Sequence, residues 1–290
     1  MKKAFAKDDA LLGTMKSATQ SGNHFQLWWL GQSGFLIKWQ TSVLLFDPYL
    51  SDSLSVKYAK TDKPHVRITE RVIDPARLDF VQVVTSSHNH TDHLDAETLQ
   101  ALAGANPDLK LVLPSANLEF ARNRVGLPQL EMIGMDDRQP VTIDPFTFHG
   151  ISAAHNEVER NENGQPRFMG FVVKFGPWSI YHSGDTLWHK DLVSELLAHK
   201  IDLAFLPING NEPARRVAGN LNGSEAAALA KATGARIVIP HHFDMFEFNT
   251  ADPGEFTSCC KRLAQNHRVL QTGEGWNSRE LELDPGETSH

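Results

Sequence analysis

Short apolar runs separated by polar turns fill the first third of the chain. The runs 25–30, 35–39 and 42–46 are rich in aromatic and β-branched residues, and the turn Gly31-Gln32-Ser33-Gly34 separates the first two. Runs of this length with glycine-containing turns predict antiparallel hairpins. A fourth apolar run, over 80–85, ends directly before a group of histidines.

Farther along the chain, strand-like runs alternate with segments of helical pattern. Asp95 and Ser115 are predicted to cap helices that extend to about residues 103 and 124. The other predicted helices cover 190–199, 224–233 and 253–264, and the other predicted strands cover 110–113, 141–149, 168–175, 178–182, 202–207, 236–240 and 268–271. Hairpins followed by strand–helix alternation predict an α/β fold of two mixed β-sheets with helices on their outer faces.

The domain organisation follows from the absence of any Pro/Gly/Ser-rich linker in the sequence. We predict an N-terminal arm or short helix over 1–24, a single domain over 25–283 and a C-terminal tail over 284–290.

Composition narrows the classes of function. The chain has 290 residues, of which 41% are hydrophobic, and this is enough for a sizeable core. Its 28 Lys and Arg against 35 Asp and Glu give a formal net charge of −7, with no basic block. We therefore expect a small-molecule substrate, no nucleic-acid partner and no stable membrane insertion.

The sequence also bears on the compartment. The two cysteines, Cys259 and Cys260, are adjacent, which excludes a disulfide framework and a zinc site built from cysteines. Charged residues interrupt every apolar run near the start, so the sequence predicts no signal peptide. We expect a cytoplasmic protein, and a homo-oligomer is left open.

A histidine-rich segment is the strongest chemical signal in the chain. Ser86-Ser87-His88-Asn89-His90-Thr91-Asp92-His93 directly follows the predicted strand 80–85. Imidazole and carboxylate together suit Zn, Mn or Fe(II), whereas the lack of thiolate argues against copper(I) or iron–sulfur chemistry. Four such side chains on one short loop point in different directions, so further ligands must come from other loops.

Three later residues are candidates for those ligands. His155, Asp185 and His242 each follow a predicted strand, in that order along the chain. Taken singly, each histidine could equally be a capping or surface residue, and Asp185 could belong to an Asx-turn. Their recurrence at successive strand ends favours a shared metal site.

These residues make the sequence similar to the metallo-β-lactamase superfamily, whose binding motif is His-x-His-x-Asp-His. The resemblance extends over roughly 26–272. It is closest to the branch that contains ascorbate-6-phosphate lactonase and N-acyl-phosphatidylethanolamine phospholipase D, and the segments that carry it are 27–34, 44–49 with Asp47, 181–185, 201–211, 239–242 and 251–253. The resemblance implies a four-layer αββα sandwich.

The resemblance also implies the ligand roles. His88, His90 and His155 would bind a first divalent metal ion, and Asp92, His93 and His242 would bind a second. Asp185 would bridge the two ions. Zinc is the first choice of metal, with Mn and Fe as alternatives.

The implied chemistry is hydrolysis by a metal-bridging hydroxide, with Asp92 and Asp185 as catalytic residues. We expect the substrate to be a lactone or ester of a small anionic molecule, such as a phosphorylated sugar derivative. The main alternative is a phosphodiesterase, including a phospholipase D-like enzyme. Thioesterase and nuclease activities and a non-catalytic metal-binding scaffold also remain open.

Four residues are candidates for substrate binding. Arg215 and Arg216 lie on the predicted loop 210–222, and arginine can bind a carboxylate or phosphate through two hydrogen bonds. Gln32 lies in the turn between two predicted strands, and His241 directly precedes the predicted ligand His242. The alternatives are a solvated charged loop for the arginines and a plain turn for Gln32.

Overall fold

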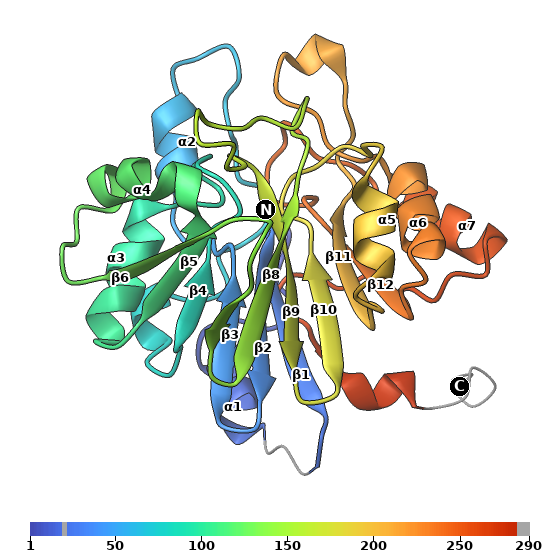
Figure 1. The fold of residues 1–290 in the computed structure, drawn as a ribbon. Coiled ribbons are helices and arrows are strands. Elements are labelled where there is room, and N and C mark those ends of the chain that lie inside the picture. Colours follow the sequence, from blue (N-terminus) through green and yellow to red (C-terminus); the bar gives the residue numbers. More distant parts are fainter. Residues whose placement is uncertain (19–21, 283–290) are drawn as a thin grey trace.

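The computed structural model, which describes residues 1–18 and 22–282, contains two mixed β-sheets packed face to face (Figure 1). The first sheet has the order β13-β1-β2-β3-β4-β5-β6. Its strands are β1 (Phe25–Gly31), β2 (Gly34–Trp39), β3 (Ser42–Phe46), β4 (Val83–Thr85), β5 (Lys110–Pro114), β6 (Glu131–Met135) and β13 (Gly275–Asn277). The pairs from β3 to β6 are parallel, and the others are antiparallel.

The second sheet has the order β12-β11-β10-β9-β8-β7. Its strands are β7 (Val141–Ile143), β8 (Phe146–Ser152), β9 (Met169–Phe175), β10 (Trp178–His182), β11 (Leu203–Pro207) and β12 (Ile237–His241). Parallel pairing joins β10, β11 and β12, and antiparallel pairing joins β7 to β10. As a result β8, β10 and β12 all run in the same direction.

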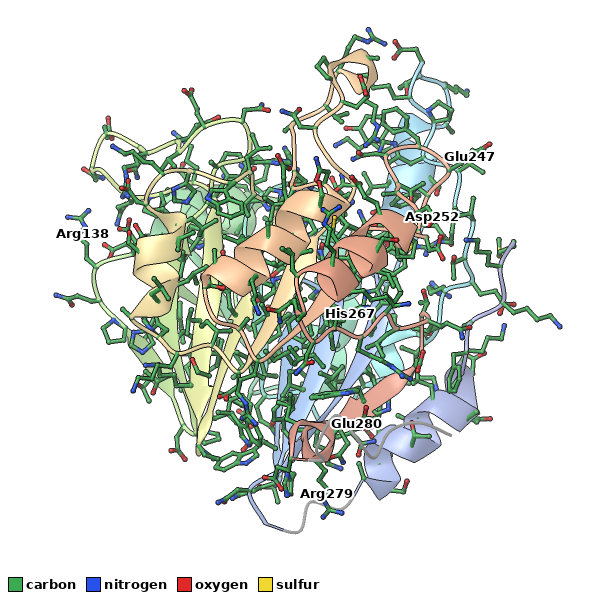
Figure 2. All side chains as sticks on the ribbon, turned by 90° about the vertical axis from the view of Figure 1, so that its right-hand side faces the viewer. Arg138, Glu247, Asp252, His267, Arg279 and Glu280 are labelled. Carbon is green, nitrogen blue, oxygen red and sulfur yellow. The ribbon has the colours of Figure 1, made fainter. Side chains whose placement is uncertain are left out.

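Helices cover the outer face of each sheet, which completes four layers. On the first sheet lie α1 (Asp8–Ser17), α3 (Ala96–Ala105) and α4 (Leu118–Val125), and α5 (Leu192–Leu197), α6 (Gly223–Ala232) and α7 (Gly254–Arg262) lie on the second. Figure 2 views the molecule from the side of this second set, with its helices lying across the strands. The short helix α2 (Ser53–Tyr58) follows β3. The predicted α/β fold of two mixed sheets between helices is confirmed.

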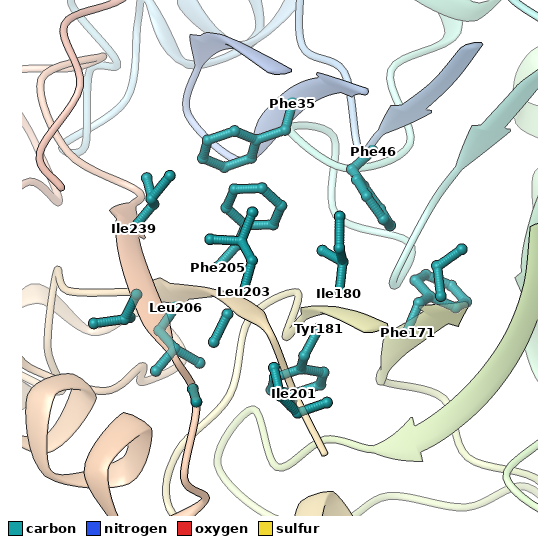
Figure 3. Close-up of a cluster of buried hydrophobic side chains, with 14 of the residues drawn as sticks. Phe35, Phe46, Phe171, Ile180, Tyr181, Ile201, Leu203, Phe205, Leu206 and Ile239 are labelled. Atoms are coloured by element: carbon teal, nitrogen blue, oxygen red, sulfur yellow. The ribbon is translucent and has the colours of Figure 1, made fainter. Parts of the chain in front are cut away.

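Side chains alternate between the two faces of a strand, so one sheet contributes to two hydrophobic cores. In β2, Phe35 and Ile37 face the second sheet, whereas Leu36 packs under the helices of the first. Both faces of the strand are therefore apolar, as expected for strands covered on both sides. Between the sheets, the ring of Phe35 stacks on that of Phe205 with centroids 3.9 Å apart (Figure 3).

Several predicted elements need correction. The predicted strand 141–149 is two strands, because Asp144 and Pro145 form the turn of a hairpin. No strand forms over the predicted range 268–271, and the nearest pairing is a single bridge between Val238 and His267, just before it. The helix predicted from Ser115 starts with a 3-10 turn (Ser115–Asn117), and α4 begins at Leu118.

Other elements were not predicted at all. They are α2, β6, β13 and three short 3-10 helices at Pro75–Arg77, Pro213–Arg215 and Ser278–Leu281. Within the predicted N-terminal segment, residues 8–17 form α1. The predicted tail 284–290 lies outside the described residues. In residues 1–18 and 22–282, no helix is both long and apolar enough to cross a membrane.

The packing between the sheets generates a first prediction. Phe205→Ala removes a fully buried ring from the stack with Phe35 and should lower the free energy of unfolding by about 3–5 kcal/mol. Guanidinium chloride unfolding measures this loss. The matched control is Phe5→Ala, since the Phe5 side chain is 60% exposed and should matter little. Equal shifts of the two midpoints would contradict this account of the core.

Candidate metal centre

The seven predicted ligands meet at one edge of the sandwich. Four of them lie on the loop between β4 and α3, and the other three follow β8, β10 and β12, which run in the same direction. Because parallel strands end at the same edge, segments far apart in sequence converge there. The residues brought together are His88, His90, Asp92, His93, His155, Asp185 and His242.

Their donor atoms form two groups with Asp185 between them. One group contains His88, His90 and His155, the other contains Asp92, His93 and His242, and within each group the donor atoms lie within 4.8 Å of one another. Asp185 Oδ1 lies 3.3 Å from His93 Nε2, and Asp185 Oδ2 lies 3.6 Å from His155 Nε2. Asp185 Oδ2 also lies 3.5 Å from His242 Nε2. One carboxylate thus faces ligands of both groups.

Several of these donor atoms lack a hydrogen-bond partner among the described residues. His88 Nε2, His93 Nε2 and Asp185 Oδ1 are buried and make no hydrogen bond to any described residue. Burying polar atoms without partners is costly, so such atoms need an explanation such as a bound ion. Five imidazoles and two carboxylates form a nitrogen and oxygen donor set that fits divalent ions such as Zn, Mn or Fe. The residues present therefore fit the implied metal ions.

The outer nitrogens of two ligand histidines are held by the protein. His93 Nδ1 donates to Asp47 Oδ2 at 2.7 Å, and His155 Nδ1 donates to the backbone oxygen of Gly219 at 2.8 Å. Each bond fixes the tautomer and orientation of its ring and leaves Nε2 facing the other ligands.

Asp47, the first residue after β3, is itself tightly held. Its carboxylate also accepts from Thr85 Oγ1 at 2.7 Å and from the backbone N–H of Ser87 at 3.1 Å. Burial alone would raise the pKa of Asp47, but the hydrogen bond from His93 outweighs it with the help of neighbouring charges and holds the pKa below its usual value. Asp47 therefore stays ionised under His93. It was noticed in the sequence only as part of the family resemblance, without a role.

The protonation of the histidines differs between the two groups. Burial lowers the pKa of His90 to about 4 and lowers that of His155, so both rings are neutral at pH 7, as metal ligands must be. Burial also disfavours the charged form of His242, but the Asp185 carboxylate outweighs it and raises the pKa of His242 to about 9. In the metal-free centre, a proton on His242 thus offsets the negative charge of Asp185.

Glycine allows the Asp185 loop to approach the histidine loop. Gly184 has a φ of 58°, and a Cβ at this position would lie 2.5 Å from the Cβ of Ser87. Any side chain at residue 184 would push Asp185 away from His88 and His93.

Comparison with known proteins agrees with this geometry. The family model described as "Beta-lactamase superfamily domain" matches residues 43–243, which include all seven candidate ligands. The chain belongs to the beta-lactamase superfamily. This confirms the predicted metallo-β-lactamase superfamily, and a curated relative named as a lactonase supports the lactonase-like branch.

Two curated relatives of this superfamily member are named as hydrolases. "UPF0173 metal-dependent hydrolase" from Caldivirga maquilingensis is 27% identical over 245 residues, which are 83% of this chain and 92% of the relative. "Probable L-ascorbate-6-phosphate lactonase UlaG" from Escherichia coli O139:H28 is 23% identical over 260 residues, which are 80% of this chain and 73% of the relative.

A solved structure supports the fold of the superfamily for this chain. The metallo-β-lactamase fold protein YhfI from Bacillus subtilis superposes with a TM-score of 0.65 at 19% identity. The match covers 89% of this chain and all of YhfI. The predicted four-layer αββα architecture is confirmed.

A cavity of about 340 Å³ opens above the candidate ligands of this beta-lactamase superfamily domain. Asp92, Asp185 and three of the ligand histidines form part of its lining. The rest of the wall includes the apolar residues Leu54, Tyr58 and Phe246, and four cationic side chains, Lys57, Lys63, Arg124 and Arg216. Its volume lies at the small end of the usual range for small-molecule sites.

The two arginines predicted to bind substrate differ in position. Arg215 does not line the cavity, as far as the described residues show, because its guanidinium donates to Asn209 O and Asn249 Oδ1. This corrects the expectation for Arg215. Arg216 does line the cavity, but it forms an ion pair with Asp62 at the rim.

Gln32 and His241, the other two predicted substrate contacts, also differ in position, since only Gln32 lines the cavity. Gln32 lines the cavity, and its Nε2 donates to Asp92 Oδ2 at 2.9 Å. His241 is fully buried between the sheets, where it stacks on His182 and lies 3.1 Å from Ser33 Oγ. His241 therefore cannot touch a substrate in the cavity, which corrects the second expectation.

Three other cavity residues were not singled out from the sequence. Lys57 lies on the unpredicted helix α2, Arg124 lies in the last turn of α4, and His65 lies on the long connection between α2 and β4. The only signal for Arg124 is its place in the last turn of a predicted helix, which is also where a solvated arginine is common.

The held position of Asp47 generates a prediction about metal binding. Asp47→Asn removes the charge that orients His93 and should weaken zinc binding by roughly 10- to 100-fold. Competition with a chelating dye measures the affinity. The control is Asp202→Asn, because Asp202 accepts a backbone hydrogen bond from Ser179 at the opposite end of the second sheet. Zinc affinities that fall equally in both variants would show a general loss of stability instead.

Proposed function

We propose that the protein is a dinuclear metal-dependent hydrolase that cleaves a lactone or ester of a small anionic molecule. The observation that carries the proposal is the placement of Asp185, whose carboxylate lies within 3.6 Å of histidines from both groups of candidate ligands. The names of the curated relatives support the hydrolase class.

Divalent ions held at such a centre polarise the bond that breaks and lower the pKa of water to near neutrality. The protein itself holds two of the ligand histidines in fixed orientations. Asp47 and Gly219 orient two of the histidines before any ion arrives. Pre-positioned ligands reduce the rearrangement that binding and reaction require.

Asp92 is the carboxylate best placed to handle a proton. Its side chain is 15% exposed and lines the cavity, whereas that of Asp185 is only 4% exposed. The hydrogen bond from Gln32 Nε2 to Asp92 Oδ2 fixes the rotation of the carboxylate. Asp92 can therefore accept the proton of the attacking water while it also serves as a ligand.

The cavity supports a small substrate over a lipid. A volume of about 340 Å³ suits a sugar-sized molecule better than a phospholipid with two acyl chains. Four cationic side chains against two carboxylates in the wall support an anionic substrate. A phosphodiesterase activity uses the same ligands, so it is tested alongside.

Metal depletion and reconstitution test the dinuclear centre. The purified protein, dialysed against a chelator and then loaded with Zn, Mn or Fe(II), should bind two equivalents per chain. Asp185→Ala should lower the stoichiometry to one, because it removes the carboxylate that contacts histidines of both groups. Elemental analysis by mass spectrometry measures both values. A wild-type chain that binds a single equivalent would contradict the bridging role.

Hydrolysis of defined compounds tests the reaction. The metal-loaded protein should open phosphorylated sugar lactones faster than it cleaves bis-4-nitrophenyl phosphate. Asp92→Asn should lower kcat about 100-fold or more, since it removes the proton acceptor. Its metal content must be measured in parallel. Faster cleavage of the phosphodiester would favour the alternative enzyme, and no turnover of any substrate with two ions bound would favour a scaffold.

A further inference from the structure

Two cationic side chains in the cavity wall contact the loop that carries the first ligands. Arg124, from α4, donates Nη1 to the backbone oxygen of Asn89 at 2.5 Å. Lys57, from α2, donates Nζ to Thr91 Oγ1 at 3.4 Å. Asn89 and Thr91 flank the candidate ligand His90, so both cations lie beside the candidate metal centre.

Neither cation is neutralised by the protein. In residues 1–18 and 22–282, no carboxylate forms an ion pair with Arg124 or Lys57. A guanidinium carries five N–H donors and an ammonium three, so both groups keep donors for a ligand beyond the single hydrogen bonds given above. Both also line the cavity.

The surroundings hold Arg124 in place while they remove water from it. Its guanidinium lies 4.5 Å from the centroid of the Phe120 ring, a contact that restricts its plane. Burial lowers the pKa of Arg124, against smaller opposing effects from Asp95 and Tyr58. A partly buried arginine that is held in this way and has no carboxylate partner is suited to bind an anion from solution.

The other two cations of the wall are already engaged. Arg216 pairs with Asp62, and Lys63 Nζ donates to the backbone oxygen of Arg216 at 2.5 Å. These contacts tie the two residues to each other and to Asp62. Among the cavity cations that have no carboxylate partner in residues 1–18 and 22–282, Arg124 and Lys57 are the two that contact the histidine loop.

We propose that Arg124 and Lys57 form a subsite for the phosphate or carboxylate group of the substrate, beside the metal centre. The subsite rests on the proposed function, because it places the anionic group at one end of a molecule whose reacting ester or lactone lies over Asp92 and Asp185. It replaces the arginine pair expected from the sequence.

Aromatic side chains next to Lys57 indicate what lies between the two ends, since Lys57 Nζ lies 5.1 Å from the centroid of the Tyr58 ring. The rings of Tyr58 and His65 have centroids 4.5 Å apart, and those of His65 and Phe246 have centroids 5.2 Å apart. His65 Nδ1 donates to the backbone oxygen of Lys63 at 2.9 Å, so Nε2 is left as an acceptor. These side chains suit a compact body, such as a sugar ring, that carries hydroxyl groups.

A binding measurement tests the subsite without relying on turnover. Calorimetry on the zinc-loaded protein compares a straight-chain sugar alcohol phosphate, which cannot be hydrolysed as a lactone, with the same sugar alcohol lacking phosphate. Arg124→Gln and Lys57→Met should each weaken binding of the phosphate compound about 10-fold or more. The matched control Arg122→Gln removes an exposed arginine from the same helix, α4, that is not among the residues lining the cavity, and should bind it like the wild type.

Kinetics with a matched substrate pair separates the subsite from general damage. For a six-carbon sugar lactone phosphorylated at its primary hydroxyl, Arg124→Gln should raise KM about 10-fold or more, with little change for the unphosphorylated lactone. Arg124→Lys should recover part of the loss. Equal losses for both lactones, or unchanged phosphate binding in both variants, would overturn the subsite. Tight phosphate binding without any hydrolysis would instead contradict only the proposed function.

Discussion

The ring of Phe46, the last residue of β3, stacks on that of His182, the last residue of β10, with centroids 4.9 Å apart and planes only 5° apart. This contact joins the two sheets at the edge where the candidate ligands gather. Asp47 follows Phe46 and holds His93, while Asp185 lies three residues after His182. The distance between the sheets at this point thus sets the distance between ligands that come from different sheets.

The candidate centre is also built on unusual backbone. Gln32, Asp47 and His242 adopt positive φ values of 49°, 35° and 61°, in a region that residues other than glycine seldom occupy. Such conformations cost roughly 1–3 kcal/mol each and persist only where the surroundings impose them. Here the dense core between the sheets and the hydrogen bonds of Asp47 and Gln32 impose them. The packing of the core thus keeps these backbone conformations, and with them the positions of the candidate ligands, fixed.

The sequence predicted those parts of the site that depend on strand order. His155, Asp185 and His242 were found because apolar strands are visible in one dimension and parallel strands end at a common edge. His241 shows the limit of this reasoning. It is adjacent to His242, and only the alternation of side chains at the end of β12 turns it into the core. The positions of two adjacent histidines in the sequence do not show which of them faces the other candidate ligands.

The anion subsite shows why the rest could not be predicted. Arg124 reaches the histidine loop because α4 packs beside that loop, and this depends on tertiary packing that no local pattern records. In the sequence, Arg215 and Arg216 were the stronger candidates, since they follow a strand that ends at the edge where the ligands gather. In the folded chain, Arg215 donates hydrogen bonds to Asn209 and Asn249, and Arg216 forms an ion pair with Asp62. What distinguishes Arg124 is that it lines the cavity and has no carboxylate partner among the described residues, and both properties belong to the folded chain alone.

Charge can be interpreted in the same local way. The net charge of −7 describes the whole surface, whereas a substrate in the cavity meets Arg124, Lys57 and the ions that the ligands would hold. Two divalent ions would outweigh the carboxylates of Asp92, Asp185 and Asp47, so the field in the cavity would be positive. An acidic protein can therefore favour an anionic substrate, because screening by water and salt confines the influence of distant surface charges.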